Sequence, residues 1–280
     1  AIRRQRQMCI RDRFIYGLNL GVAGAAIASC ISFGIGGIAM FLLMLSKTKL
    51  RPTREDRRLD REILSETFTI GLPALGTTFV SCFGYIAFAR MVSGMGTTIF
   101  AAHSIAITAE QIVYIPGYGL RVATSTLVGN ALGEKDIRKL KATERVSILI
   151  TLLIMVVNGI GLYLFAYPFM RLFTNSVNAA RIGSEMLRLV SFSEPFFGLM
   201  IVLEGISYGM GRTKHVFACE AVSMWGIRIF GTFLCVNVFG LGLKAVWLCM
   251  IADNICKAIL LYIFRPKHVE ENADDRGELR

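Results

Sequence analysis

Residues that could bind an ion or a charged substrate lie inside otherwise apolar stretches of the sequence. A charged group in a membrane-spanning helix is costly, so it pairs, faces a cavity or takes part in function. The candidates are the acids Glu110, Glu194 and Glu204, the proline Pro116, and the pair Asp253 and Lys257.

Glu110 stands six residues before Pro116 and Gly117. Proline and glycine at this spacing predict a break or kink in the helix, which would leave backbone carbonyls without their donors. A carboxylate near such carbonyls is the chemistry that a Na⁺ or H⁺ site needs. A role for Glu110 in helix packing alone remains the alternative.

Glu194 and Glu204 share one apolar stretch, and Glu194 directly precedes Pro195. Either acid could contact a coupling cation or a cationic compound, and packing between helices explains either equally well. Glu194 has the proline beside it, whereas Glu204 falls near the cytoplasmic end of its stretch.

Asp253 and Lys257 are spaced i, i+4 with the acid first, which is the better order for an ion pair on a helix. We interpret them as a neutral structural pair. The seven cysteines show no CxxC spacing and lie mostly in apolar runs, so we interpret them as small buried side chains. The sequence shows no metal-ligand spacing, nucleophile triad or phosphate loop, so we expect neither an enzyme nor a bound cofactor or metal.

The composition places these residues in a lipid bilayer. Of 280 residues, 54% are hydrophobic and only 18% are charged, below the share in soluble domains. The net charge of +11 could indicate nucleic-acid binding, but the basic residues cluster in short gaps between apolar runs. That pattern is typical of a multi-pass membrane protein and argues against a nucleic-acid partner.

The apolar runs predict an all-α protein with seven transmembrane helices, because each run is long enough to cross the bilayer. The predicted spans are Phe14–Ser46, Thr67–Ala89, Phe100–Leu132, Val146–Met170, Glu185–Gly209, Val216–Val238 and Ala245–Phe264.

The basic gaps predict the orientation. The gaps at 47–61, 134–145 and 212–214 and the tail from Arg265 are rich in Arg and Lys, so we place them in the cytoplasm. The arginine-rich stretch 1–13 would then lie outside, where such a segment resists translocation. We therefore expect residues 1–13 to be foreign to the protein, from cloning or from an assembly or sequencing error.

Four ordered fragments resemble the multidrug and toxic compound extrusion (MATE) family of transporters. They are Gly71-Leu72-Pro73, the stretch from Gly96 to Ala106 containing Ala101-Ala102-His103, the stretch from Pro116 to Gly133 containing Thr126-Leu127-Val128-Gly129, and Tyr208-Gly209-Met210-Gly211-Arg212-Thr213.

The resemblance implies an organisation in two six-helix lobes. Residues 14–46 would be the last helix of the first lobe, 47–65 a cytoplasmic linker, 66–266 the second six-helix lobe, and 267–280 a polar cytoplasmic tail. The chain would then be a fragment whose missing N-terminal lobe is a partner.

The resemblance also implies an H⁺- or Na⁺-coupled antiporter in the cell membrane that exports amphiphilic or cationic drugs by alternating access. Acids that some members carry are replaced here near Val80 to Phe83 and Pro195 to Phe197, so the coupling ion stays open. One alternative is a flippase for lipids or lipid-linked oligosaccharides, which would need basic side chains in its cavity. A seven-helix receptor is a remote alternative.

Overall fold

The computed structural model describes residues 21–47 and 60–264, and these residues form helices without any strand. They divide into two units, one up to Leu64 and one from Ser65 onward. The basic stretch 1–13, most of the predicted linker 47–65 and the predicted tail 267–280 lie outside the described residues. The first unit contains α2 (Gly21–Lys47), an apolar helix without an acid in its first turn.

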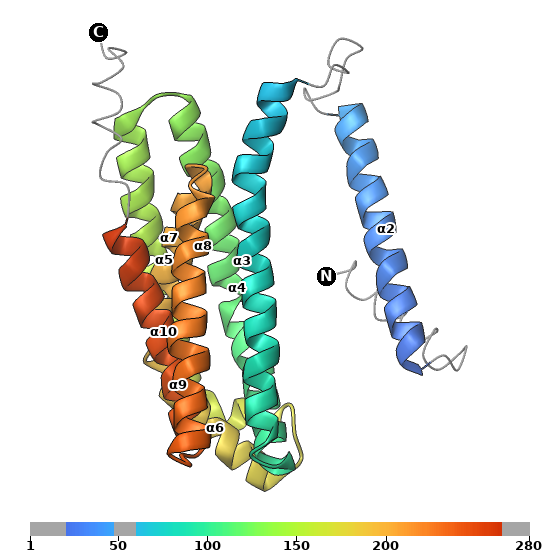
Figure 1. The fold of residues 1–280 in the computed structure, drawn as a ribbon, viewed down its shortest axis with the longest axis vertical. Helices are drawn as coiled ribbons and strands as arrows, with labels where there is room; N and C mark the ends of the chain where they lie inside the picture. The colour runs from blue at the N-terminus through green and yellow to red at the C-terminus, as the bar shows by residue number, and fades with distance from the viewer. Residues whose placement is uncertain (1–20, 48–59, 265–280) are drawn as a thin grey trace. The chain divides into compact units, whose positions relative to one another are not determined.

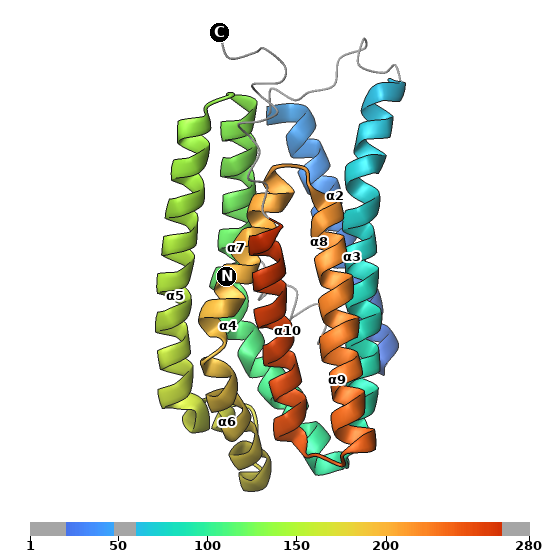
Figure 2. The ribbon, with the colours of Figure 1, turned by 60° about the vertical axis from the view of Figure 1, so that its left-hand side comes forward.

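The second unit is a bundle of long helices, and successive spans run in opposite directions (Figures 1 and 2). Its elements are α3 (Arg61–Ser93, which begins within the first unit), α4 (Thr97–Gly133), α5 (Ile137–Arg171), α6 (Val177–Ser191), α7 (Glu194–Gly209), α8 (Thr213–Ala221), η3 (Val222–Ile229), α9 (Phe230–Phe233), η4 (Leu234–Val238) and α10 (Leu243–Ile263). Elements α8 to η4 form one rod that includes two π-helical segments, η3 and η4.

Six described helices are long and apolar enough to cross a membrane, and the bent pair of α6 and α7 raises the number to seven. The predicted fifth span, Glu185–Gly209, is therefore not one straight helix. It bends by 60° between Ser191 and Glu194. Pro195 in the first turn of α7 explains the position of the bend, because proline cannot donate a backbone hydrogen bond to the preceding turn.

The sequence predicts a break or a kink at Pro116, and a break does not occur, since α4 continues as one helix from Thr97 to Gly133. Pro116 removes the N–H that would donate to the carbonyl of Ile112, and a neighbouring helix contacts the next carbonyl along the chain. The side-chain amide of Asn158 on α5 donates a hydrogen bond of 3.1 Å to the carbonyl of Val113. Polar groups from neighbouring helices commonly support a proline inside a membrane helix in this way.

Capping side chains and glycine turns mark where the long helices begin and end. The Asp136 side chain accepts a hydrogen bond from the Lys139 amide and caps the start of α5. Gly211 has a φ of 71° in the turn between α7 and α8, a conformation that favours glycine. These turns let consecutive helices reverse direction at the ends of the bundle.

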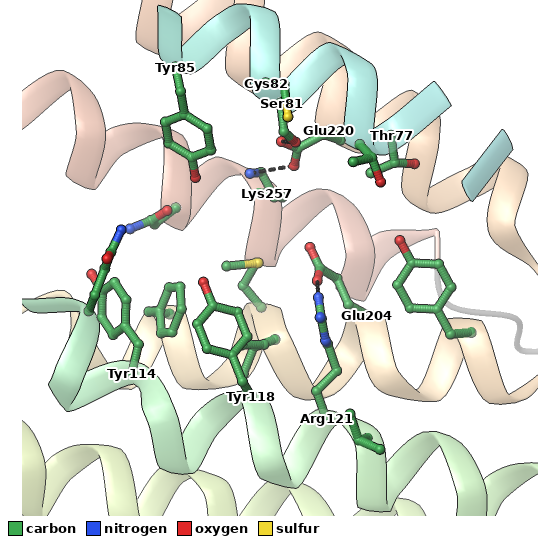
Figure 3. A pocket seen from close by; sticks show the side chains of 18 of the residues that line it. Thr77, Ser81, Cys82, Tyr85, Tyr114, Tyr118, Arg121, Glu204, Glu220 and Lys257 are labelled. Carbon is green, nitrogen blue, oxygen red and sulfur yellow. Dashed lines mark hydrogen bonds and ion pairs between the residues drawn. The ribbon is translucent and has the colours of Figure 1, made fainter. Parts of the chain in front are cut away.

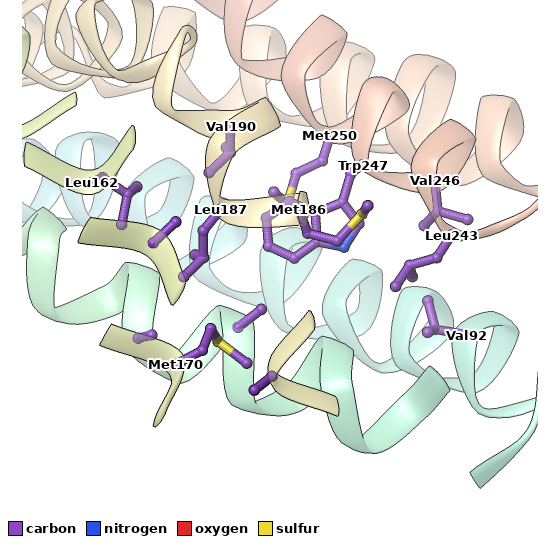
Figure 4. Close-up of a cluster of buried hydrophobic side chains, with 14 of the residues drawn as sticks. Val92, Leu162, Met170, Met186, Leu187, Val190, Leu243, Val246, Trp247 and Met250 are labelled. Carbon is purple, nitrogen blue, oxygen red and sulfur yellow. The ribbon is translucent and has the colours of Figure 1, made fainter. Parts of the chain in front are cut away.

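A buried apolar cluster joins α3, α4, α5, α6 and α10 (Figure 4). Trp247 is fully buried in it, and its indole N–H donates a 3.2 Å hydrogen bond to Nδ1 of His103 on α4. A second cluster joins α4, α5, α7, α8 and α10. The two clusters fix α4 and α10 against the other helices, which matters because both helices line the cavity described below.

Helices α4 and α7 approach closely where glycines leave room. A Cβ atom added at Gly205 would lie 2.7 Å from the carbonyl oxygen of Arg121, and one at Gly209 would lie 2.6 Å from that of Ser125. Backbone atoms cannot easily retreat from such contacts, so the distance between α4 and α7 depends on these two glycines.

We expect Gly205→Ala to lower the free energy of unfolding by about 1–3 kcal/mol, because the added methyl group overpacks a rigid contact. Gly119→Ala on α4 is the matched control, since no atom lies within 4 Å of its added Cβ. That control should be neutral or stabilising by up to ~1 kcal/mol. Unfolding in detergent measures both, and equal effects of the two variants would contradict the close packing.

Candidate functional site

A cavity of about 760 Å³ lies between α3 on one side and α4, α7 and α10 on the other (Figure 3). Its polar and aromatic lining comprises Thr77, Thr78, Ser81, Cys82, Tyr85, Glu110, Gln111, Tyr114, Tyr118, Arg121, Ser125, Thr126, Phe197, Glu204, Tyr208, Glu220, Arg228, Asn254 and Lys257. A cavity of this size holds a drug-sized molecule.

Lys257 and Glu220 form a buried ion pair at the α3 side of the cavity (Figure 3). Lys257 Nζ lies 2.6 Å from Glu220 Oε2, and their side chains are 8% and 7% exposed. The Ser81 hydroxyl of α3 donates a hydrogen bond to the other oxygen of Glu220. This contact connects α3 to α8 and α10 across the edge of the cavity.

Arg228 and Asp253 form a second buried pair, with Nε and Oδ2 2.8 Å apart. Asp253 also accepts a hydrogen bond from the Ser223 hydroxyl, and Arg228 Nη2 donates to Asn254 Oδ1 over 3.4 Å. The predicted partners Asp253 and Lys257 lie 3.9 Å apart. Each therefore has a closer partner on η3 or α8, because helix packing brings Arg228 and Glu220 to the same face of α10.

Arg121 and Glu204 form a third pair, 3.1 Å apart, between α4 and α7. It is more open than the others, since the Arg121 side chain is 35% exposed. The guanidinium also lies 5.4 Å from the centre of the Tyr118 ring, within the range of a cation–π contact. Glu204, a predicted site residue, thus lines the cavity as half of an ion pair.

Glu110 lines the cavity and is 2% exposed. The Tyr114 hydroxyl, one helical turn further on, donates a hydrogen bond to Glu110 Oε1. The Tyr114 ring stacks on Phe197 of α7 at 3.8 Å. Glu110 therefore has a hydroxyl partner and an aromatic wall, but no ion pair to it is seen among the described residues.

Glu194 lies at the bend between α6 and α7 and is fully buried. Neither of its carboxylate oxygens has a hydrogen-bond partner among the described residues. The Cβ atom of Glu194 packs against α5, since a Cβ added at Gly159 would lie only 3.2 Å from it. Glu194 does not line the cavity directly, but it is close enough to Glu110 to interact electrostatically.

Pro116 is exposed and lies outside the cavity lining. The cavity-facing residues of α4 instead follow one helical stripe: Glu110, Tyr114, Tyr118, Arg121 and Ser125. Their spacing of three or four residues was visible in the sequence and could have predicted the stripe. The partners Glu220 and Arg228 could not be assigned in that way, since they come from a different helix.

Three acids and three basic residues line the cavity, and each basic residue has an acidic partner. Its charges therefore balance locally, while tyrosines and phenylalanine provide apolar and cation–π contacts. Within residues 21–47 and 60–264, no group of three or more His, Cys, Asp or Glu side chains could hold a metal ion. The arrangement is suited to binding an amphiphilic molecule that carries charge.

Comparison with protein families gives a match to the model described as MatE over residues 73–234. A "Probable multidrug resistance protein NorM" from Thermotoga maritima is 29% identical over 256 residues, covering 88% of this chain and 53% of that protein. The chain thus spans about half the length of the curated relatives that it matches.

Solved structures show the same fold. A structure described as "Crystal structure of MATE in the bent conformation" has a TM-score of 0.83 at 20% identity, over 97% of this chain and 60% of that chain. Another, from Pyrococcus furiosus, has a TM-score of 0.79 at 22% identity over 92% and 58%. It is described as a MOP superfamily transporter whose "reverse polarity of binding pocket suggests different function".

The ion pairs predict a ranking of stability. Lys257→Met should lower the free energy of unfolding by about 3–5 kcal/mol, because it leaves the buried Glu220 without its cation. Arg121→Met should cost less, since its pair is more open to solvent. Adding Glu220→Gln to Lys257→Met should recover most of the loss. Chemical unfolding in detergent tests this, and a double variant no more stable than Lys257→Met would count against the pairing.

Proposed function

Because the matched model covers more than half of its residues, the chain belongs to the MatE family, and we propose that it is part of a transporter that exports drug-like compounds. The resemblance read from the four sequence fragments is thereby confirmed, as is the all-α membrane fold. A seven-helix receptor, the remote alternative, gains no support from the family match.

The observation that carries the proposal is the cavity between α3 and the helices α4, α7 and α10. It has the size of a drug-sized ligand, an aromatic lining and charged groups at fixed positions. An amphiphilic compound would place its rings against Tyr114, Tyr118 and Phe197. A positive group on the compound would be attracted by Glu110, the acid in the lining that has no ion pair among the described residues.

We assign ion coupling to Glu110 and Glu194. Two neighbouring carboxylates in a low-dielectric interior repel each other unless a proton or a cation neutralises one of them. Glu194 lies at the bend between α6 and α7, so binding of H⁺ or Na⁺ there would change the balance of charge where these two helices meet. Coupled transport requires two conformations that differ in their affinity for the ion and for the drug.

Alternating access would require a first lobe facing the cavity, as the length of the relatives implies. We therefore propose that α2 belongs to that first lobe and that the bundle from α3 to α10 is the second. The transporting protein would sit in the cell membrane with the connection between α4 and α5 and the C-terminus in the cytoplasm, as the clusters of Arg and Lys favour.

A flippase for lipids or lipid-linked oligosaccharides is the second candidate, because Arg121 and Arg228 both line the cavity. Arg90, in contrast, is exposed near the end of α3 and outside the lining. Every basic residue in the cavity lining has an acidic partner, so its charge is already neutralised and is less available to an anionic lipid. We therefore rank drug export first. Transport of a cationic dye and of an anionic lipid by the full-length parent protein in vesicles would separate the two candidates, and movement of the lipid alone would favour the flippase.

In the full-length parent protein, Glu110→Gln and Glu194→Gln should each weaken gradient-driven drug export, because an amide has no negative charge with which to bind H⁺ or Na⁺. The effect of the ion on drug affinity, about 5- to 150-fold for typical coupling between sites, should be lost. Export driven by an imposed pH gradient or Na⁺ gradient measures the effect and identifies the ion. Glu185→Gln is the control, because Glu185 forms an exposed pair with Lys244 at 3.1 Å. Unchanged coupling in Glu110→Gln, at equal expression, would return that residue to a packing role.

The proposed orientation predicts which connections react with a membrane-impermeant thiol reagent. In a variant without native cysteines, a cysteine introduced between positions 93 and 98 should be labelled from outside intact cells. One introduced within 134–145, which comprises the connection between α4 and α5 and the first turns of α5, should be labelled only after permeabilisation, because Arg and Lys near short spans resist translocation. Labelling of the segment 134–145 in intact cells would invert the orientation.

A further inference from the structure

Two cysteine sulfurs meet where the last two spans of the bundle turn. Cys235 lies in η4 and Cys249 lies in α10, and their Sγ atoms are 3.7 Å apart. Both side chains are half-buried. The sequence shows no such relation, because 13 residues separate the two positions and neither belongs to a CxxC pair.

The backbone explains why the thiols lie so close. Gly231, one helical turn before Cys235, faces Cys249, and a Cβ added there would lie 3.3 Å from Cys249 Sγ. The missing side chain lets the two helices approach. The short turn that follows is held by a 2.7 Å hydrogen bond from the Leu241 amide to the Cys235 carbonyl and by Gly240, with a φ of 61°.

We propose that Cys235 and Cys249 are a redox pair that forms a reversible disulfide between η4 and α10. Sulfurs in a disulfide lie about 2.05 Å apart, on cysteines whose Cα atoms are roughly 4.4–6.8 Å apart. Two thiols already in contact need only side-chain rotation and a small closing movement to reach that geometry. The turn and the close approach at Gly231 keep the backbones in place meanwhile.

The chemistry is thiol–disulfide exchange with an oxidant that is itself a disulfide, either in a protein or in a small molecule. A thiolate of the pair attacks the oxidant and forms a mixed disulfide, and the second cysteine then displaces the oxidant. In balance, two S–H bonds break, one S–S bond forms, and the oxidant takes up two electrons and two protons as it becomes two thiols.

The turn between η4 and α10 lies at the opposite end of the bundle from the connection between α4 and α5 and the basic first turns of α5 (Figures 1 and 2). In the orientation proposed above it faces the outside, where disulfides form and persist. Access to the oxidant rests on that proposed orientation, whereas the ability of the two thiols to join does not.

The disulfide would connect α10, which carries Asp253, to η4, which continues the same rod as η3, the element that carries Arg228. Cys249 stands one turn before Asp253 on α10, and Cys235 lies two turns after Arg228. The oxidised form would therefore hold η3 and α10 in the arrangement that keeps this pair at 2.8 Å. We expect oxidation to raise the melting temperature of the bundle by a few degrees and reduction to reverse the rise.

Peptide mapping of the purified chain tests the pair without any transport assay. The chain, in lipid nanodiscs, is treated with diamide or with oxidised glutathione, blocked with a maleimide, denatured and cleaved with trypsin. Cleavage after Arg228, Lys244 and Lys257 places Cys235 in peptide 229–244 and Cys249 in peptide 245–257. We expect these two peptides to be joined, and the number of blocked thiols to fall by two from the seven of the reduced chain.

Peptide 245–257 also contains Cys256, and Cys219 lies in the tryptic peptide 215–228. Two variants show whether Cys249 or Cys256 forms the disulfide. Cys256→Ala should keep the link to peptide 229–244, and Cys249→Ala should lose it. A link that persists in Cys249→Ala, a link to the Cys219 peptide 215–228 instead, or no link in the oxidised original chain would each overturn the proposal. Failure of drug export would leave all three results unchanged, so the two proposals are tested separately.

Discussion

The cost of burying charge in a membrane bundle governs the arrangement of this protein. A buried ion whose partner is removed costs several kcal/mol, so each cation in the interior must meet an acid. Lys257 meets Glu220, and Arg228 meets Asp253, in both cases between different elements. These pairs require α8, η3 and α10 to pack in one register, and Ser81 brings α3 into the same network through Glu220.

The cavity follows from that network. Helix α3 is held near its middle by the Ser81 contact and at Gly84, where an added Cβ would meet the Met224 side chain at 2.6 Å. On the other side, Gly205 and Gly209 fix α7 against α4. Between these contacts the stripe of tyrosines and acids on α4 faces the cavity. A bundle with bulky residues at the glycines would place the stripe elsewhere.

The acids differ in what surrounds them, and this difference gives them different roles. Glu220, Glu204 and Asp253 have cations as partners and stabilise the packing of helices. Glu110 has only the hydroxyl of Tyr114 among the described residues, and Glu194 has no hydrogen-bond partner there. A buried carboxylate without a cation has a strong tendency to bind a proton or a metal cation. The proposal that ions act at Glu110 and Glu194 rests on this contrast.

The sequence by itself determined the elements, because the length and hydrophobicity of each run decide whether it spans a bilayer. The same argument selected Glu110, Glu194 and Glu204 as candidate binding residues, since an acid inside such an apolar run is exceptional. The predicted pair of Asp253 and Lys257 shows what sequence spacing does not determine. Spacing on one helix gives the neighbours along that helix, whereas the closest partners, Arg228 and Glu220, come from another.

Pro195 marks the position of the bend before Glu194, but only the tertiary structure decided that α4 continues as one helix through Pro116 and that Cys235 meets Cys249. A proline removes one backbone donor, and the surrounding helices decide whether the helix continues past it; near Pro116, Asn158 of α5 donates to the carbonyl of Val113. Two thiols in separate spans meet only if the backbones between them approach closely, as Gly231 allows. Such contacts depend on the packing of residues that are distant in sequence, and local composition does not encode them.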